Sequence, residues 1–269
     1  MKKYLQNMMA VVFLTIFLPY TITLLMGGRQ GIHQEEELPA LEYQVLHRML
    51  EENCSWMEDD TLKLMAVLYR TECVRSGAVS DSSELSYERY EESYERMYEA
   101  VVHTRGQVIT IQGEYRELPY HEVSAGRTRK GTLLGEAFSY VKEADCPEDL
   151  QSDQYLQISV LREKDIKQAL GSVFDSEHME LRRDSAGYVT ELICPEGKWQ
   201  GESVRNLLHL PSSCFYMEPV DRGIRVTVKG DGHGFGISLY TADRMIRDGA
   251  GIPDIIQKFY EGAECITIP

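Results

Sequence analysis

Beyond residue 40, apolar residues recur at helical spacing through the first part of the chain. Leu41, Val45 or Leu46, and Met49 or Leu50 lie on one face of such a helix, and this spacing predicts an amphipathic helix. A second amphipathic helix is predicted over about residues 60–73, where four residues share a face. These are Leu62, Met65, Ala66 and Tyr69. A third helix is predicted over residues 84–100, where a stripe of tyrosines at 87, 90, 94 and 98 is expected to pack on the core.

The pattern changes after residue 105. Residues 106–123 alternate polar and apolar positions and are rich in β-branched side chains, which is typical of strands. Further strands are predicted over 187–194 and 223–230, and short helices over 162–170 and 252–260. Because helices come first and strands follow, the order predicts an α+β fold of helices and antiparallel strands rather than a βαβ array.

The N-terminal segment is a separate case. Residues 8–26 are almost wholly apolar, and a helix of this length spans about 28 Å, close to the hydrocarbon thickness of a bilayer. The segment is either a retained anchor or a cleaved signal peptide; its length and the lack of an A-x-A-like site favour the anchor. Lysines before it and glutamates 35–37 after it orient the N-terminus to the cytoplasm. We therefore expect an anchor over 1–28, a linker over 29–40 and one extracytoplasmic domain over 41–269.

Composition narrows the choice of partners. The 269 residues are 43% hydrophobic, enough for a sizeable core. The formal net charge of −15 makes nucleic acid a poor partner, since the chain as a whole repels phosphates. Six cysteines form an even number in an exported chain and permit disulfides, although the pairing cannot be deduced from sequence.

One stretch, "KGDGHGFGISLY" at 229–240, places glycine at every second position from Gly230 to Gly236, with His233 among them. No G-K-[ST] follows, and Phe235 interrupts a G-x-G-x-x-G pattern, so neither nucleotide-binding motif is present. Alternating glycines after a strand indicate tight turns or a close approach of the backbone to a ligand. His233 is accordingly either a buried core residue or part of a site.

Two other segments carry candidate chemistry. The loop "YHEVSAGRT" at 120–128 holds a histidine, a serine and an arginine, but local spacing cannot establish a Ser–His nucleophile pair. The segment "EENCSWMEDDTLKLMAVLYRT" at 51–71 places two adjacent glutamates at the end of an apolar helical face. A glutamate desolvated in a cleft acts as an acid catalyst, whereas one in solvent has no such role.

Taken in order, these segments resemble the stage II sporulation protein D family, the peptidoglycan lytic transglycosylases of engulfment. The matching residues lie in five segments, 62–71, 104–108, 120–128, 203–212 and 230–242, which are followed by "IIQKFYEG". The resemblance covers roughly residues 41–268. Counting ten residues back from Leu62 places the family's glutamate at Glu52, with Glu51 as the alternative if the register slips by one.

The resemblance implies cleavage of the bond between N-acetylmuramic acid and N-acetylglucosamine without water, leaving a 1,6-anhydro end. Glu52 is then both the acid and the base. The arginines and the serine are expected to hold N-acetyl or hydroxyl groups, the tyrosines to stack on a sugar, the histidines to line the cleft, and the glycines to let the main chain approach the glycan. The expected substrate-binding residues are Arg70, Tyr120, His121, Ser124, Arg205, His233 and Tyr240.

Some family members bind zinc near the loop of His121, so His121 and Cys146 are candidate ligands of a structural zinc ion. The implied partners are glycan strands, a peptidoglycan amidase and a membrane organiser, acting between mother cell and forespore. The sequence departs from the family pattern at Glu122, Leu239 and Thr241, and Asn53 and Cys54 replace Met-Pro. The alternative function is therefore a membrane-anchored scaffold that binds glycan without cleaving it.

Overall fold

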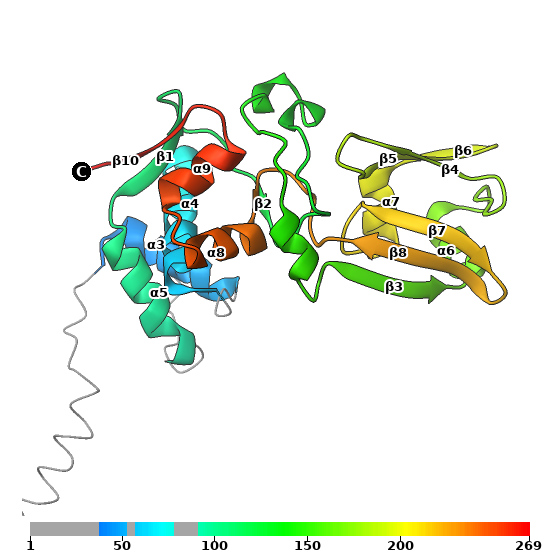
Figure 1. Ribbon diagram of the computed structural model, residues 1–269, viewed down its shortest axis with the longest axis horizontal. Helices are drawn as coiled ribbons and strands as arrows, with labels where there is room; N and C mark the ends of the chain where they lie inside the picture. Colours follow the sequence, from blue (N-terminus) through cyan, green and yellow to red (C-terminus); the bar gives the residue numbers. More distant parts are fainter. Residues whose placement is uncertain (1–37, 53–56, 78–90) are drawn as a thin grey trace, which may run out of the picture. The chain divides into compact units, whose positions relative to one another are not determined.

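The computed structural model describes residues 38–52, 57–77 and 91–269 (Figure 1). The chain divides into two units, Met1–Pro39 and Ala40–Pro269, and the second contains every element described here. The apolar segment 8–26, Cys54 and the first part of the predicted helix 84–100 lie outside the described residues. Within the described ranges, no helix has the length and apolar character needed to cross a bilayer.

The described part of the second unit begins with helices, and strands and shorter helices follow. The α-helices are α3 (Ala40–Glu51), α4 (Asp59–Ser76), α5 (Glu91–His103), α6 (Glu163–Leu170), α7 (Gly201–Leu207), α8 (Leu239–Arg247) and α9 (Ile252–Phe259). The strands are β1 (Gln107–Ile111), β2 (Tyr120–His121), β3 (Leu156–Leu161), β4 (Glu180–Arg183), β5 (Val189–Cys194), β6 (Gly197–Gln200), β7 (Phe215–Val220), β8 (Gly223–Lys229), β9 (Ile237–Ser238) and β10 (Ala263–Thr267). Short 3₁₀ helices are η4 (Gly131–Leu133), η5 (Glu136–Phe138) and η6 (Pro147–Gln151). The α+β prediction is confirmed.

Helix α4 is the centre of the first core. Its residues from Leu64 to Thr71 are all buried, so it is covered nearly all round by α3, α5, α8 and β1 rather than on one face as predicted. The helix ends at Gly77, which adopts a left-handed conformation (φ 62°) and donates its N–H to the Cys73 carbonyl. At the other end, Asp243 of α8 accepts from the Glu58 N–H at 3.0 Å and from the Thr61 hydroxyl at 2.8 Å.

A buried ion pair lies inside this helical core. Arg70 of α4 donates from Nη2 to Glu42 Oε2 of α3 at 2.6 Å, and the two side chains are 0% and 4% exposed. The remaining guanidinium donors reach Thr104 and the carbonyls of Val101 and Gln107. Arg70 therefore ties α3, α5 and the start of β1 to α4, and removing it would leave a buried carboxylate without its cation.

The strands form small sheets. Strand β1 pairs with β10 antiparallel, β3-β8-β7 and β4-β5-β6 are antiparallel three-stranded sheets, and β2 and β9 form a short parallel pair. Both three-stranded sheets lie between residues 156 and 229, an excursion between β2 and β9 (Figure 1). The sequence predicted β5 and β8 within this excursion but not β3 or β7.

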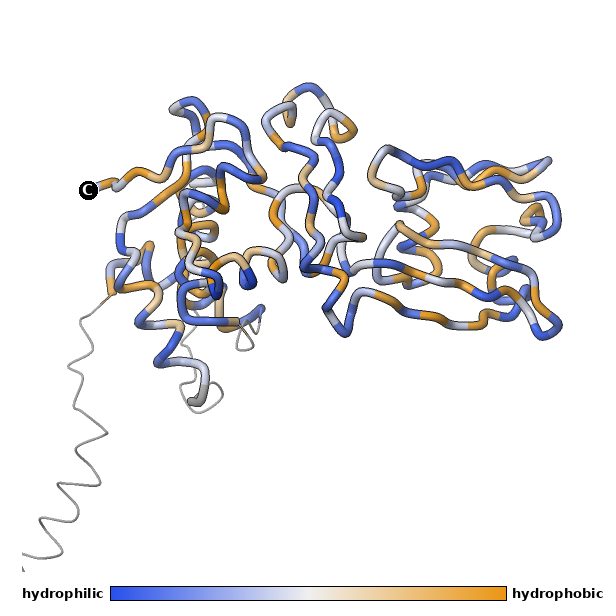
Figure 2. Tube along the Cα trace, in the orientation of Figure 1, coloured by the Kyte–Doolittle hydropathy of each residue, from blue (hydrophilic) through white to orange (hydrophobic). Residues whose placement is uncertain are grey.

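The excursion has a core of its own. Buried side chains of α6, α7, β5, β7 and β8 pack together there, among them Ile166, Val204, Phe215 and Val226. Buried and more exposed positions alternate along β8, and Figure 2 shows the matching alternation of hydropathy. The described residues thus form one hydrophobic cluster around α4 and another in the excursion.

Arg129 connects the excursion to the glycine-rich segment. Its side chain, 6% exposed, pairs with Asp184 at 2.7 Å and with Glu202 at 2.8 Å, both residues of the excursion. The guanidinium carbon also lies 5.0 Å from the ring centroid of Tyr188 and 4.4 Å from that of Phe235. One arginine therefore contacts both sides of this junction through charge and through aromatic faces.

We predict that Arg70→Met lowers the free energy of unfolding by about 3–5 kcal/mol, because Glu42 would remain buried without its partner. Urea denaturation of the purified domain measures this. The matched control is Arg162→Met, which removes an exposed pair with Asp165, 65% and 45% exposed, and is expected to cost about 1 kcal/mol or less. Equal losses in the two variants would contradict the structural role of Arg70.

Candidate active site

Glu52 lies just past the end of α3 and is exposed. Its Oε2 accepts a hydrogen bond from the Tyr120 hydroxyl at 3.3 Å, and that hydroxyl also lies 3.2 Å from the Tyr69 hydroxyl. The alternative acid, Glu51, lies instead 3.5 Å from the His47 ring. Of the two adjacent glutamates, the geometry thus brings Glu52 to the segment that carries the candidate histidines.

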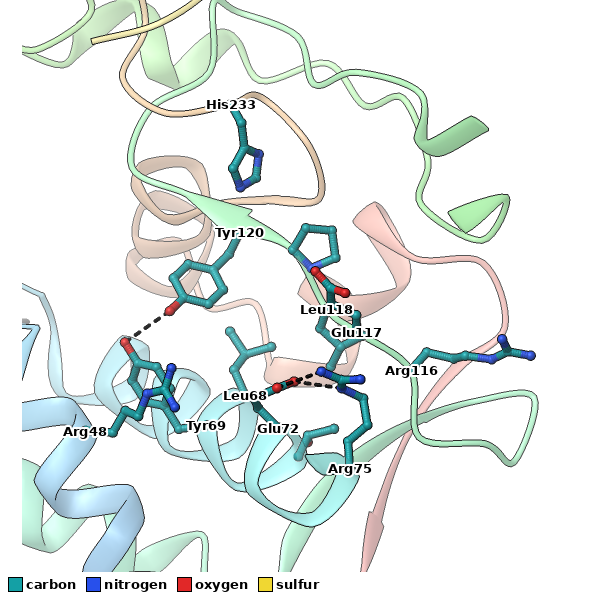
Figure 3. Close-up of a pocket in the computed structure, with 12 residues that line it drawn as sticks. Arg48, Leu68, Tyr69, Glu72, Arg75, Arg116, Glu117, Leu118, Tyr120 and His233 are labelled. Atoms are coloured by element: carbon teal, nitrogen blue, oxygen red, sulfur yellow. Dashed lines mark hydrogen bonds and ion pairs between the residues drawn. The ribbon is translucent and has the colours of Figure 1, made fainter. Parts of the chain in front are cut away.

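A cavity of about 460 Å³ opens beside this contact, between α4 and the segment 116–120 (Figure 3). Tyr120 and His233 line it together with Tyr69 and with charged residues. These charged residues are Arg48, Glu72, Arg75, Arg116 and Glu117. The volume lies in the range of small-ligand sites, and the mixture of aromatic rings and polar groups is suited to a sugar.

His121 and His233 form the second part of the site, with ring centroids 5.7 Å apart. The Nδ1 of His121 lies 3.1 Å from the Phe235 carbonyl, which can only accept, so the proton is on Nδ1. Its Nε2 is buried and has no hydrogen-bond partner among the described residues. Burial, followed by the charge of His233, lowers the pKa of His121 to about 3, so its imidazole is neutral near pH 7.

His233 is half-buried and differs in its hydrogen bonding. Its Nδ1 accepts from the Phe235 N–H at 3.0 Å, so a neutral ring carries its proton on Nε2. Burial lowers the pKa of His233 as well. His233 is also one of the residues that line the cavity.

The alternating glycines have a packing role. A Cβ on Gly232 would lie 2.5 Å from the Cβ of His121, and one on Gly236 would lie 1.8 Å from the Pro119 carbonyl oxygen. Both residues also have positive φ, 110° and 69°. The bare backbone lets the segments 119–125 and 230–236 pack against each other; the expectation that it makes room for a glycan is wrong for these two positions.

Charged residues surround the histidines. Arg205 is half-buried, donates to the Leu210 carbonyl at 3.4 Å, and helps to lower the pKa of both histidines. Burial raises the pKa of Glu122, and the charges of Asp231 and of Glu52 raise it further. Glu122 is therefore an acidic side chain near Glu52 at a position where the family pattern has serine.

Asp149, which the sequence reasoning missed, holds the loops of the site together. Its carboxylate is buried and accepts from the Ser124 N–H at 2.7 Å, from the Ser238 hydroxyl at 2.8 Å and from the Thr241 hydroxyl at 2.8 Å. These donors belong to the loop after β2 and to the start of α8, which carries Tyr240. The main-chain N–H of Tyr240 in turn donates to the Glu122 carbonyl at 3.1 Å.

Two of the predicted glycan-binding residues, Arg70 and Ser124, are too deeply buried to contact a ligand. Arg70 is 0% exposed and its donors are taken by Glu42, Thr104 and main-chain carbonyls, so it cannot reach a ligand. Ser124 is also 0% exposed, and its Oγ accepts from the Gly126 N–H at 3.1 Å. The polar groups of both residues are thus engaged within the fold.

The described residues contain no group of three or more His, Cys, Asp or Glu side chains placed to hold a metal. Zinc binding by His121 and Cys146 stays a prediction. The lone pair on His121 Nε2 would suit a metal. Burial and the charge of Asp149 raise the pKa of the Cys146 thiol to about 12, so without a metal this thiol is protonated near pH 7. Cys146 is a free thiol here, as are Cys73, Cys194, Cys214 and Cys265.

No family model matches the chain. Two curated proteins are similar to it. Stage II sporulation protein D of Bacillus subtilis (strain 168) is 27% identical over an alignment of 179 residues, which covers 65% of this chain but only 52% of the relative. Stage II sporulation protein D of Bacillus amyloliquefaciens is 26% identical over an alignment of 264 residues, which covers 88% of this chain and 76% of the relative.

Both similarities support assignment of the chain to the stage II sporulation protein D family and a role in sporulation. This chain spans only about half the length of the first relative, so the similarity alone does not assign it an activity. Two of the departures from the family pattern are internal: Leu239 is 1% exposed and Thr241 is 0% exposed, so neither alters the surface of the cavity.

His121 predicts an acid-sensitive fold. Because its folded pKa of about 3 lies below its unfolded value of 6.5, the stabilising contribution is present above pH 6.5 and is lost as pH falls toward 3. Between pH 7 and pH 5 this costs about 2 kcal/mol. The test is the difference in unfolding free energy between wild type and His121→Asn as a function of pH. A difference that does not change with pH would contradict a buried neutral ring.

Cys146 predicts selective resistance to alkylation. With its pKa near 12, the thiol is protonated at pH 8, and its side chain is buried, so iodoacetamide should leave it unmodified in the folded protein. Peptide mapping by mass spectrometry measures this, with the urea-unfolded chain as the control for full labelling. Rapid labelling of Cys146 in the folded state would contradict the assignment.

Proposed function

We propose that the chain is a lytic transglycosylase that cleaves the bond between N-acetylmuramic acid and N-acetylglucosamine in peptidoglycan strands. The single observation that carries this is the position of Glu52. Its carboxylate contacts the Tyr120 hydroxyl at 3.3 Å, at a cavity of about 460 Å³ that Tyr120 and His233 line. A carboxyl group hydrogen-bonded to a residue that lines a polar, aromatic cavity is suited to proton transfer at a glycosidic oxygen.

The proposed reaction uses one carboxyl group twice. Protonated Glu52 donates its proton to the glycosidic oxygen as the bond from that oxygen to the anomeric carbon breaks. The muramyl 6-hydroxyl then attacks the anomeric carbon, and the Glu52 carboxylate accepts the proton that this hydroxyl loses. The products are an N-acetylglucosamine end and a 1,6-anhydromuramyl end, and no water is consumed.

The neighbouring side chains have supporting roles in this proposal. Tyr120 donates to Glu52 and fixes the direction of its carboxyl group. His233, neutral because burial lowers its pKa, is placed to hydrogen-bond sugar hydroxyl or N-acetyl groups from the cavity wall. Arg205 and Tyr240 complete the polar surroundings, whereas Arg70 and Ser124 act only through the fold.

The exposure of Glu52 favours a second candidate function. Acid catalysts in glycosidases are usually desolvated, and this carboxyl group faces solvent. A scaffold that binds glycan without turnover would need the same cavity but no desolvated acid. A bound sugar chain would itself cover Glu52, so the two candidates differ in whether product forms.

We further propose that residues 8–26 anchor the protein in the membrane with the domain outside the cytoplasm, between mother cell and forespore. The partners proposed there are an amidase that strips stem peptides from the glycan and a membrane organiser. This proposal is supported by the apolar run, the flanking charges and the family membership.

The test is release of 1,6-anhydromuramyl products from purified, peptide-free glycan. We expect Glu52→Gln to lower the rate by about 10²-fold or more while glycan binding persists, because the amide cannot donate or accept the proton. Glu51→Gln is the matched control, with the same charge change at the adjacent residue, and should retain activity. Loss of activity in Glu51→Gln alone would move the role to Glu51; binding without release by wild type would support the scaffold.

A further inference from the structure

Tyr69 of α4 lies next to the hydrogen-bond partner of the proposed acid. It is 3% exposed, and its hydroxyl oxygen lies 3.2 Å from the hydroxyl oxygen of Tyr120. The two rings meet edge-on, with centroids 6.2 Å apart and planes at 86°. Figure 3 shows the two hydroxyl groups pointing toward one another. Because α4 is buried along most of its length, the hydroxyl of Tyr69 is held by a fixed element of the fold.

The Tyr120 hydroxyl contacts two oxygen atoms but has one proton. It lies 3.3 Å from Glu52 Oε2 and 3.2 Å from the Tyr69 hydroxyl, so it donates to only one of them at a time. An ionised carboxylate can only accept, so the Tyr120 proton goes to Glu52 and Tyr69 supplies the proton between the two tyrosines. The protons then point one way, from Tyr69 to Tyr120 to Glu52, and each hydrogen bond in such a chain strengthens the next.

The same chain of hydrogen bonds determines where the acidic proton of Glu52 lies. A protonated carboxyl group carries its proton on one oxygen and accepts through the other. While Tyr69 donates to Tyr120, Tyr120 keeps its own proton for Oε2, and the acidic proton is then on Oε1, directed away from the tyrosines. Without the Tyr69 hydroxyl, Tyr120 is no longer held in this orientation and can accept the acidic proton instead. An acid that gives its proton to a tyrosine is not aligned for transfer to a ligand.

Three charged groups adjoin these hydrogen bonds. Arg48 and Glu51 precede the proposed acid on α3. The guanidinium carbon of Arg48 lies 6.0 Å from the Tyr69 ring centroid. Glu122 lies on the segment after β2, and the charge of Glu52 contributes to its raised pKa, so the two carboxyl groups are close enough to interact. All three groups are kept in the variants below, so a difference between variants reports the hydroxyl groups.

We propose that Tyr69 is a positioning residue whose hydroxyl directs the Tyr120 proton to Glu52 and thereby places the acidic proton on the other carboxyl oxygen. This inference rests on the proposed function, since it gives Tyr69 a part in proton transfer by Glu52. Tyr69 takes this part through Tyr120. The hydrogen bonds themselves require no ligand, so they can be measured in the free protein, apart from the reaction.

The first test follows the Glu52 carboxyl carbon by ¹³C NMR as pH is varied, with the signal assigned by its loss in Glu52→Gln. Tyr69→Phe keeps the ring and removes the hydroxyl, so the ionised carboxylate loses stabilisation and its titration midpoint should rise by about 0.2–0.5 pH units. In the Tyr120→Phe background the same substitution should have no further effect, because the described contacts link Tyr69 to Glu52 through the Tyr120 hydroxyl. The matched control is Tyr140→Phe, which also removes a mostly buried hydroxyl, one that donates to the Glu117 carbonyl, and should leave the midpoint unchanged.

The second test is the rate of anhydromuramyl release from peptide-free glycan. Tyr69→Phe should lower kcat about three- to fivefold with little change in KM, because the ring that lines the cavity is kept while the acid loses its alignment. In the Tyr120→Phe background it should again have no further effect. A kcat unchanged by Tyr69→Phe, or a loss that persists in the Tyr120→Phe background, overturns the part of Tyr69 in proton transfer.

The outcomes separate the two proposals. A midpoint that does not move in Tyr69→Phe, or that moves equally with and without the Tyr120 hydroxyl, overturns the role of Tyr69 even if wild type releases anhydromuramyl products. A shift that requires Tyr120, without product release by wild type, supports the alignment of Glu52 by Tyr69 and overturns the proposed reaction.

Discussion

The buried carboxylate of Asp149 is the interaction on which the geometry of the candidate site depends. It accepts from the Ser124 N–H and from the hydroxyls of Ser238 and Thr241, so a charge without solvent contact is compensated by three donors. Those donors fix the loop that follows His121 and the first turn of α8. Thr241 stands where the family pattern has glycine, and its hydroxyl makes one of these three hydrogen bonds. The sequence alone shows only that the motif residue is missing at this position.

The sequence predicted those helices and strands whose buried apolar residues recur on one face. The spacing of Leu41, Val45 and Met49 predicted α3, and the apolar run near the C-terminus predicted α9. Helix α4 was predicted from four apolar positions on one face, but it is buried nearly all round. Helices α5 and α8 pack on its other sides, and the spacing of apolar residues within α4 does not reveal this packing. Strand β3, exposed along almost its whole length, has no alternation to detect.

The candidate site was predictable only where one short motif carries the residue. Glu52, Tyr120 and His233 followed from the order of the motifs. Tyr120 and His233 line one cavity, and Glu52 accepts a hydrogen bond from the Tyr120 hydroxyl. Asp149 did not, because its significance comes from contacts between distant segments: it meets Ser238 across 89 positions of sequence. The prediction that Arg70 contacts the glycan is wrong for a different reason. Arg70 matches a motif but is buried, so it is required by the fold rather than by a ligand.

The junction at Arg129 has a consequence for how such a protein can diverge. The excursion 156–229 has its own apolar cluster, and Arg129 meets it mainly through Asp184, Glu202 and the face of Tyr188. Side chains inside that cluster can be exchanged among apolar types without disturbing these contacts, whereas the charges at the junction must change together. Over evolutionary time the excursion is therefore free to vary its interior as a module while its attachment to the glycine-rich segment stays constrained.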